Sequence, residues 1–399
     1  MIPELRREFN ASFNERSYQR FRERLDHRCR SPIPFRIAET PLFVPRTFQR
    51  QCEEAAVALA LQSHSPHYLT ASDAALKPEY TVANQTDRST FLTVDFAIAV
   101  DEFGTMVPRL IELQGFPSLM GFQLAYAELA LEHYALPPAL EYVNGGHSRA
   151  EFVALLRDAI VADADPENVV LLELDPWAQK TRADFTMIQE LLGIEVADIR
   201  AVKKIDRVLH YERDGTWIPI QRIYNRTIVD ELERRNIELP FNWNDDLDVE
   251  WAGHPNWYFR ISKFALPFLQ HPTVPDTRFL SAVDEIPDDL DNYVLKPLYS
   301  FAGAGVIVGP TREDVSSVAP DRRDLYVLQQ RVRYADAIDT PEGPTKAELR
   351  VMLIWHPKED APRPVMGLVR MGRGRLMGVD QNTKQRWIGA GCNFYEPDV

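Results

Sequence analysis

Hydrophobic and polar positions repeat along the chain with two different periods. Apolar residues recur every three to four positions, which predicts helices over 48–62, 121–134, 152–160 and 182–192. Alternating positions or short apolar runs predict strands at 168–174, 195–198, 293–297, 326–331, 348–353 and 365–370, and hairpins that turn at 101–104 and 214–215. The mixture predicts an α/β (α+β) fold class.

Strand and helix alternate most regularly in the middle of the chain. A buried strand ending near Leu174, a helix over 182–192 and a second strand at 195–198 predict a small parallel sheet, as in a Rossmann-like α/β domain. This stretch has no glycine fingerprint for a dinucleotide, so we expect a substrate or support domain here.

The hairpin that contains Asp95 carries the first candidate chemistry. In its second strand, Glu112 and Gln114 share one face, while Ile111 and Leu113 are expected to enter the core. Asp95 lies in the paired strand and can reach the same side as Glu112 and Gln114. Because Mg²⁺ prefers oxygen ligands from carboxylates and phosphates, these three side chains are a candidate metal site. The alternative is an ordinary hairpin with solvated polar positions.

Composition narrows the possible partners. A chain of 399 residues with 45% hydrophobic content can bury a large core in two or three domains. The formal net charge of -14 argues against a nucleic-acid partner. No apolar run approaches the length of a membrane span and no signal-peptide pattern opens the sequence, so a cytoplasmic protein is expected. The cysteines at 29, 52 and 392 match no metal spacing and are expected to be reduced.

The last third of the sequence holds candidate phosphate ligands. Lys263 precedes an apolar stretch predicted as a helix, and Lys296 ends a strand that leads into a small-residue loop containing Ser300, Gly303 and Gly305. Such a loop allows backbone N–H groups to approach phosphates, while lysines neutralise their charge.

Three later segments complete the candidate nucleotide site. The strand that carries Leu328, Gln329 and Gln330 is a candidate for contact with an adenine edge. Arg350 and Arg370 each lie on a predicted central strand that delivers an arginine to the site. For Arg350, a structural salt bridge with a nearby acid such as Glu348 or Asp380 is an equal alternative to a catalytic role.

The order of these parts resembles the ATP-grasp superfamily, and specifically its circularly permuted branch that includes glutathionylspermidine synthetase-like ligases. In that branch the metal-binding strands come early in the chain, as the Asp95 hairpin does here. The similar segments are 95–114, 255–263, 293–305, 328–330 and 368–370, and together they span roughly 85–399. Two positions depart from the family pattern, since Gln114 replaces an asparagine and Thr93 replaces an arginine.

The resemblance implies an ATP-grasp fold with a permuted chain order and three parts. Residues 1–165 would supply N-terminal helices and metal-binding strands, 166–255 a small α/β domain, and 256–399 the lysines, glycine loop, hinge and last strands. It also implies ATP and Mg²⁺ as cofactors. Lys263 and Lys296 would contact phosphates, and Arg370, with Arg350, would stabilise the transferring phosphoryl group.

The implied activity is ligation of a small-molecule carboxylate to an amine through an acyl phosphate. Two alternatives remain: a degraded ATP-grasp protein that binds nucleotide as a scaffold or sensor, and a partner-binding α/β protein in which the lysines are incidental. The acidic Asp245 and Asp246 and the loop near His254 are candidates for an amine-acceptor pocket.

Overall fold

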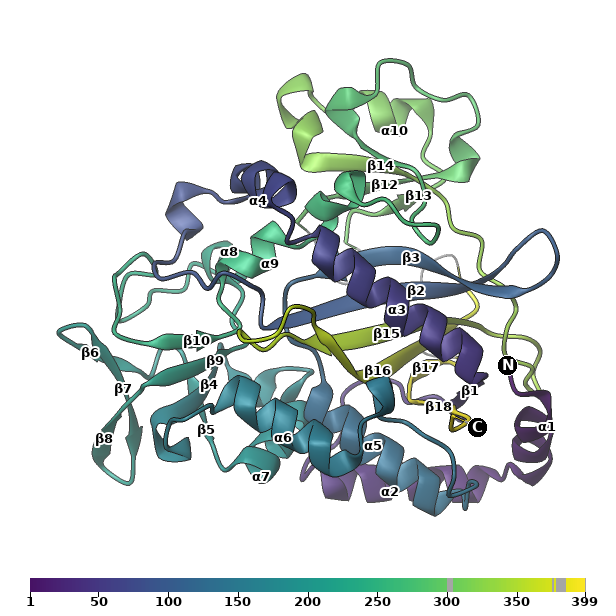
Figure 1. Ribbon diagram of the computed structural model, residues 1–399, viewed down its shortest axis with the longest axis horizontal. Helices are drawn as coiled ribbons and strands as arrows, with labels where there is room; N and C mark the ends of the chain where they lie inside the picture. Colours follow the sequence, from purple (N-terminus) through teal and green to yellow (C-terminus); the bar gives the residue numbers. More distant parts are fainter. Residues whose placement is uncertain (300–303, 375–376, 378–384, 399) are drawn as a thin grey trace.

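A five-stranded antiparallel sheet lies at the centre of the protein (Figure 1). The computed structural model describes residues 1–299, 304–374, 377 and 385–398. In spatial order the central strands are β17 (Gly389–Gly391), β16 (Arg363–Gly372), β15 (Lys346–Ile354), β2 (Phe91–Val100) and β3 (Met106–Gln114). Strands from the early and late parts of the chain therefore form one sheet, because β15 pairs with both β2 and β16.

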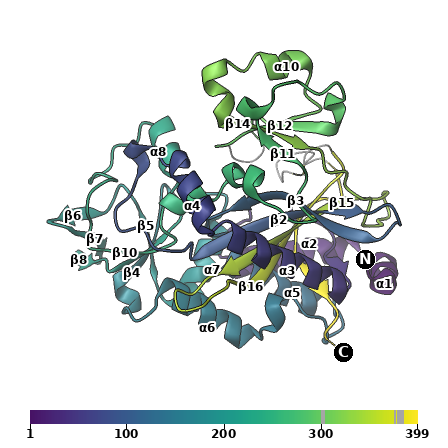
Figure 2. The same cartoon turned by 45° about the horizontal axis from the view of Figure 1, so that its top comes forward.

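One face of the central sheet is apolar and is covered by α3 (Arg46–Gln62) (Figures 1 and 2). Because side chains alternate along a strand, every second residue of β2, β15 and β16 reaches this core. The core side chains from these strands are Leu92, Val94, Phe96, Ile98, Ala347, Leu349, Val351, Leu353, Val369 and Met371. The intervening residues, Asp95 among them, are consequently directed to the opposite face.

The opposite face packs partly against helices and a second sheet. Its apolar half joins Met352 and Leu368 with side chains of α5 (Met120–His133), α6 (Arg149–Ile160) and α7 (Arg182–Leu192). The second sheet is parallel, in the order β10 (Glu250–Ala252), β9 (Arg222–Asn225), β4 (Val169–Glu173) and β5 (Glu195–Asp198). The small parallel sheet predicted from the sequence is thus confirmed.

A smaller antiparallel sheet forms the lobe at the top of Figure 1. Its order is β11 (Thr277–Phe279), β14 (Tyr326–Gln330), β12 (Tyr293–Pro297) and β13 (Ile307–Val308). Helix α10 (Arg312–Ser316) and a small apolar cluster around Leu280 and Val315 belong to the same lobe. The lobe connects to the central sheet through the segment that follows β14.

The remaining elements are peripheral. A three-stranded sheet contains β6 (Lys203–Ile205), β7 (Val208–Arg213) and β8 (Thr216–Pro219), and β1 (Leu42–Val44) pairs in parallel with β18 (Asn393–Tyr395). The other α-helices are α1 (Pro3–Ser12), α2 (Glu15–Arg28), α4 (Pro66–Ser72), α8 (Val229–Arg234) and α9 (Asn256–Arg260). No helix in the described part of the chain is long and apolar enough to cross a membrane.

Local sequence signals fixed most of these elements. The helices predicted from periodicity are found within a few residues of their expected bounds, and Ser148 and Glu151 form the capping box that begins α6. The turn at Asp214 and Gly215 has positive φ at both residues, as a type I′ hairpin requires. The three cysteines are buried and free, and the three-part domain division stays a prediction.

One predicted helix has a different form. The apolar stretch after Lys263 is a six-residue 3₁₀-helix, η6 (Lys263–Phe268), and not an α-helix. Pro267 lies inside it, and a proline lacks the N–H group that an α-helix needs at an interior position. The short element leaves Lys263 at its first position, next to the central sheet.

Gly389 in β17 provides a test of the packing between the sheet and the N-terminal segment. Its φ is 121°, and an added Cβ would lie 2.5 Å from the carbonyl oxygen of Arg36. We expect Gly389→Ala to destabilise the protein by on the order of 2–4 kcal/mol, measured by urea unfolding, because strain and overlap add. Gly343→Ala is the control, since its φ is 97° but no heavy atom lies within 4 Å of its added Cβ. Equal losses of unfolding free energy in Gly389→Ala and Gly343→Ala would show that the close approach to Arg36 adds nothing to the backbone strain.

Candidate functional site

The site is built around Asp95 and Glu112, which are directly opposite each other in β2 and β3. A bulge follows this pair, because Phe96 is paired with Leu110 and Ile111 is the extra residue. The expectation that Ile111 enters the core is therefore wrong: Leu110 takes that place, and Ile111 is only partly buried. The bulge keeps Glu112 on the same face as Asp95.

Two arginines from neighbouring strands meet Asp95. Arg350 on β15 is paired with Asp95 in the sheet, and its Nε and Nη2 donate to Oδ1 and Oδ2 at 2.6 and 2.7 Å. Arg370 on β16 donates from Nη2 to the same Oδ2. Burial alone would raise the pKa of Asp95, but the two guanidinium groups outweigh burial and hold that pKa below its usual range. The structure thus brings Arg350 and Arg370, each predicted on a central strand, together at Asp95.

Glu348 and Tyr334 extend the charged cluster. Glu348 Oε2 lies 3.0 Å from Arg370 Nε, and the Tyr334 hydroxyl donates to Glu348 Oε1. Burial, with the nearby Asp95 charge, raises the pKa of Glu348 despite the opposing effect of Arg370. Sequence reasoning named Glu348 only as a salt-bridge partner for Arg350, although its two-residue spacing from Arg350 signals a shared face. No sequence signal marked Tyr334.

The two candidate lysines meet at the β3 edge of the sheet. Lys263 Nζ lies 3.9 Å from Glu112 Oε2, and Lys296 Nζ donates to the carbonyl oxygen of Ile111 at 3.1 Å. Burial, together with the Lys263 charge, lowers the pKa of Lys296 to about 8 although Glu112 opposes the shift. Lysines that are far apart in sequence therefore share one carboxylate.

The candidate loop follows Lys296 along the chain, whereas the candidate hinge residues lie beside Lys296 in the small sheet, where β14 pairs with β12. Ser300 and Gly303 lie outside the described residues, while Gly305 has a φ of 71° and precedes β13, so β12 and β13 form the expected hairpin. Leu328 and Gln329 lie inside the small sheet, where β14 pairs on both sides. The Gln330 N–H donates to the carbonyl oxygen of Asp276, so Gln330 is still hydrogen-bonded to the neighbouring segment at the end of β14.

Gln114 and Thr93 are neighbours across β2 and β3. Gln114 Nε2 donates to Glu112 Oε1 at 2.9 Å, and Thr93 Oγ1 is buried without a hydrogen-bond partner among the residues that the structure describes. Among the described residues, no three His, Cys, Asp or Glu side chains are grouped as a metal site would require. Since both oxygens of Asp95 accept from arginines, Glu112 is the carboxylate of this hairpin that fits a divalent cation best.

A buried polar chain connects this cluster to the parallel sheet. Arg350 Nη1 donates to Ser118 Oγ at 3.2 Å, and Arg226 Nη1 donates to the Ser118 carbonyl oxygen at 2.9 Å. Arg226 follows β9, and Glu173 ends β4, so both lie at the carboxyl ends of neighbouring parallel strands. Burial raises the pKa of Glu173 to about 8 against the attraction of Arg226. No sequence pattern indicated this connection.

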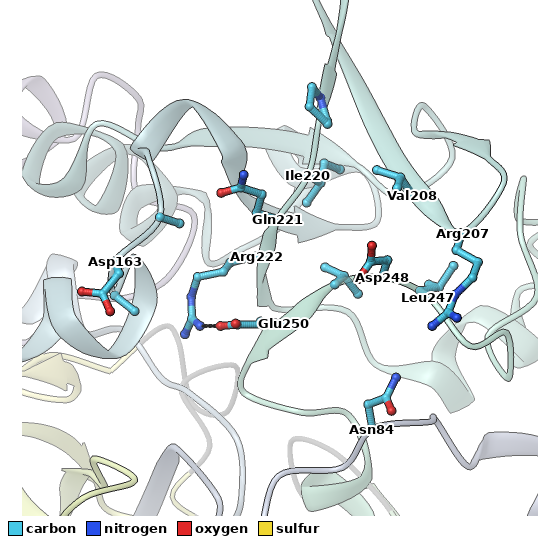
Figure 3. A pocket seen from close by; sticks show the side chains of 14 residues that line it. Asn84, Asp163, Arg207, Val208, Ile220, Gln221, Arg222, Leu247, Asp248 and Glu250 are labelled. Carbon is cyan, nitrogen blue, oxygen red and sulfur yellow. Dashed lines mark hydrogen bonds and ion pairs between the residues drawn. The ribbon is translucent and has the colours of Figure 1, made fainter.

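The residues considered for an amine-acceptor pocket have local partners. Asp245 pairs with Lys204 at 2.5 Å, Asp246 pairs with Arg207 at 2.9 Å, and a His254 ring nitrogen lies 2.9 Å from the carbonyl oxygen of Ala83. They lie near an open groove of about 810 Å³ beside β9 and β10, which Figure 3 shows. Its lining residues include Asn84, Asp163, Arg207, Arg222, Asp248 and Glu250, and Arg222 is paired with Glu250. None of the Asp95 cluster lines this groove.

Comparison with known proteins gives a likeness of structure. No family model matches the sequence, and no curated protein matches it. The structure is similar to that of a glutathione synthetase-like effector from Globodera pallida in its apo form, with a TM-score of 0.61 and 11% sequence identity. The match covers 97% of this chain and 98% of that chain, so the mixed α/β fold is glutathione synthetase-like throughout its length.

Proposed function

We propose that the protein is an ATP-dependent ligase that joins a carboxylate to an amine. The observation that carries this proposal is the convergence of four cationic side chains from four separate segments on the Asp95–Glu112 pair: Lys263, Lys296, Arg350 and Arg370. With Asp95, Glu112 and Glu348 as the three acids, cations are in excess, which favours a polyphosphate. The glutathione synthetase-like fold supports a ligase of the ATP-grasp type.

Each cation has a place in this reaction. Lys263 and Lys296, next to the β12–β13 loop, would bind the α- and β-phosphates, and residues 328–330 would lie near the adenine. Arg350 and Arg370 would bind the equatorial oxygens of the transferred phosphoryl group, where charge develops in the transition state. Their forked guanidinium groups suit phosphate and carboxylate oxygens.

Mg²⁺ is the expected companion of the nucleotide. Glu112, with the amide of Gln114, would hold it, since Mg²⁺ sites commonly combine one or two carboxylates with substrate phosphates. When bound, the ion would neutralise phosphate charge. The protein itself contributes orientation and fixed positive charge.

The acceptor side of the reaction would lie at the carboxyl ends of the parallel strands. Ligands of open α/β sheets bind outside these ends, next to the strand order switch, which here falls between β4 and β9. Arg226 and Glu173 are located there, and Ser118 links Arg226 to Arg350. A substrate carboxylate placed near Ser118 would be within reach of the transferred phosphoryl group.

The proposed reaction has two displacements. A substrate carboxylate oxygen attacks the γ-phosphorus, the bond to the bridging oxygen breaks, and ADP leaves. An amine nitrogen then attacks the acyl carbon, the carbon–oxygen bond to phosphate breaks, and the amine loses a proton as the amide forms. Positioning supplies most of the rate enhancement in such a step.

A second function is favoured by one observation. Both Asp95 oxygens accept from arginines, and Thr93 offers no charge beside them. A protein with this arrangement could bind nucleotide as a scaffold or sensor without ligation. ATP binding without ADP release across a panel of acids and amines would favour this second function.

Thermal unfolding with Mg-ATP tests nucleotide binding. At a 100-fold excess over Kd, binding should add about 2.7 kcal/mol of stability and raise Tm by a few degrees. Glu112→Gln should remove most of the additional shift that Mg²⁺ gives over ATP in EDTA. Glu102→Gln, an exposed acid in the turn of the same hairpin, is the control and should retain it. No Tm shift for the unsubstituted protein would refute the proposal, and ADP release with acids and amines separates ligase from scaffold.

A further inference from the structure

The role of Asp95 differs from that of a metal ligand. Its side chain is 1% exposed, and each of its oxygens already accepts at least one N–H from a guanidinium group. Arg350 binds it through both Nε and Nη2, the two-point geometry in which arginine is held most rigidly. Guanidinium N–H groups thus occupy three of the roughly four lone-pair sites of this carboxylate, and the two positive charges beside it oppose the binding of a cation there.

Asp95 orients the arginines while leaving part of each available. A third of the five N–H groups of Arg350, on Nη1, donates to Ser118 Oγ, and Arg370 Nε lies 3.0 Å from Glu348 Oε2 on its other side. In the described part of the chain Arg370 Nη1 makes no hydrogen bond, and 21% of this side chain is exposed. The two guanidinium groups thus keep N–H donors that Asp95 does not occupy, although Glu348 as well as Asp95 lies beside Arg370.

We propose that Asp95 is a positioning residue that holds Arg350 and Arg370 as a paired clamp for phosphate oxygens, and that this clamp works without a divalent metal. The inference deepens the proposed function and rests on it for the identity of the ligand as a nucleotide polyphosphate. It divides the hairpin between two tasks: Glu112, beside Lys263, would hold the metal, and Asp95 holds the arginines. Glu112 Oε1 lies 3.9 Å from Arg350 Nη2, farther than the 2.6 and 2.7 Å hydrogen bonds from Arg350 to Asp95. The fixed geometry reduces the entropy that the arginines lose on binding.

The test uses inorganic tripolyphosphate, which has the phosphate chain of ATP and no base. Isothermal titration calorimetry gives its Kd in EDTA and in Mg²⁺, and the ratio of these values is the Mg²⁺ enhancement. The full-length protein should bind tripolyphosphate in EDTA. Asp95→Asn, which keeps the shape but removes the charge, should weaken that binding at least 10-fold and change the enhancement less than twofold.

Glu112→Gln should show the reverse pattern. Its metal-free affinity should fall less than twofold, and the Mg²⁺ enhancement should be lost. Asp360→Asn, an exposed acid-to-amide change, should alter neither quantity. This pair of variants separates positioning of arginines from metal ligation, because a general structural defect would not leave the enhancement intact.

Arg370→Lys covers the case in which Asp95→Asn does not fold. It retains the charge but removes the forked donor, so metal-free binding should fall at least fivefold with the enhancement unchanged. A loss of enhancement in Asp95→Asn or Arg370→Lys as large as in Glu112→Gln overturns the inference, as does failure of the full-length protein to bind tripolyphosphate in EDTA. If tripolyphosphate binds with the predicted pattern but ATP does not bind, the clamp is supported and the proposed function as an ATP-dependent ligase is refuted.

Discussion

Lys296→Met should stabilise the ligand-free protein and abolish nucleotide binding. Burial lowers the pKa of Lys296 to about 8, against about 10.5 in the unfolded chain, so the charged side chain opposes folding at neutral pH. That difference corresponds to on the order of 3 kcal/mol, part of which the lost hydrogen bond to Ile111 offsets. The same charge is needed to bind phosphate, so stability and binding should change in opposite directions.

Unfolding midpoints from pH 6 to 10 check this prediction. The unfolded state binds more protons than the folded state between about pH 8 and 10.5, so the penalty from Lys296 is complete below that window and declines through it. The advantage of Lys296→Met should therefore be largest below pH 8 and should shrink as the pH rises. Lys358→Met, at an exposed lysine, is the matched control. The prediction is contradicted if Lys296→Met is less stable than the unsubstituted protein, or if Mg-ATP still raises its Tm by the same amount.

Glu173→Gln should stabilise the protein above neutral pH. Burial raises the pKa of Glu173 to about 8, so the folded state holds a proton that the unfolded state releases above about 4.5. Stability from this group is complete below the unfolded pKa and is lost as the pH rises through about 8. The loss is on the order of 5 kcal/mol, and a neutral amide avoids it.

Denaturant unfolding at pH 5 and pH 8.5 measures the difference. Glu173→Gln and the unsubstituted protein should be close in stability at pH 5, and the variant should be more stable by several kcal/mol at pH 8.5. The amide oxygen can still accept from the Leu174 N–H, which the carboxylate does at 2.8 Å. Glu54→Gln, an exposed change on α3, controls for the removal of one charge. If Glu173→Gln differs from the unsubstituted protein by the same unfolding free energy at pH 5 and pH 8.5, the folded protein does not hold a proton on Glu173.

Short-range patterns predicted the elements well because each depends on neighbouring residues. Periodicity located α3, α5 and α7, and Asp214–Gly215 specified its turn, since only residues that tolerate positive φ fit there. Two local predictions failed for reasons that a pattern does not contain. Pro267 shortened a helix to a 3₁₀ turn, and the bulge at Ile111 exchanged it with Leu110 in the core.

The candidate site was predicted less completely than the fold. Side-chain alternation placed Asp95 and Glu112 on one face of the hairpin, and Arg350 and Arg370 were each predicted on a central strand. The pairing of β15 with β2 and with β16 brings these residues together. The sequence did not reveal which group binds each of these side chains, because Asp95 could equally have bound a metal cation instead of two arginines. Tyr334, Ser118 and Arg226 lacked any signal, since their contacts join segments that are far apart in the chain.

The sequence by itself predicted the α/β class, the small parallel sheet and a set of candidate phosphate ligands. These predictions follow from the spacing of apolar side chains and from the chemistry of single residues, neither of which depends on the tertiary structure. Only the tertiary structure decided that Asp95 accepts from two arginines and that Lys296 is buried beside Lys263. Ion pairing and desolvation depend on distances between strands hundreds of residues apart, and those distances are set when the strands join one sheet.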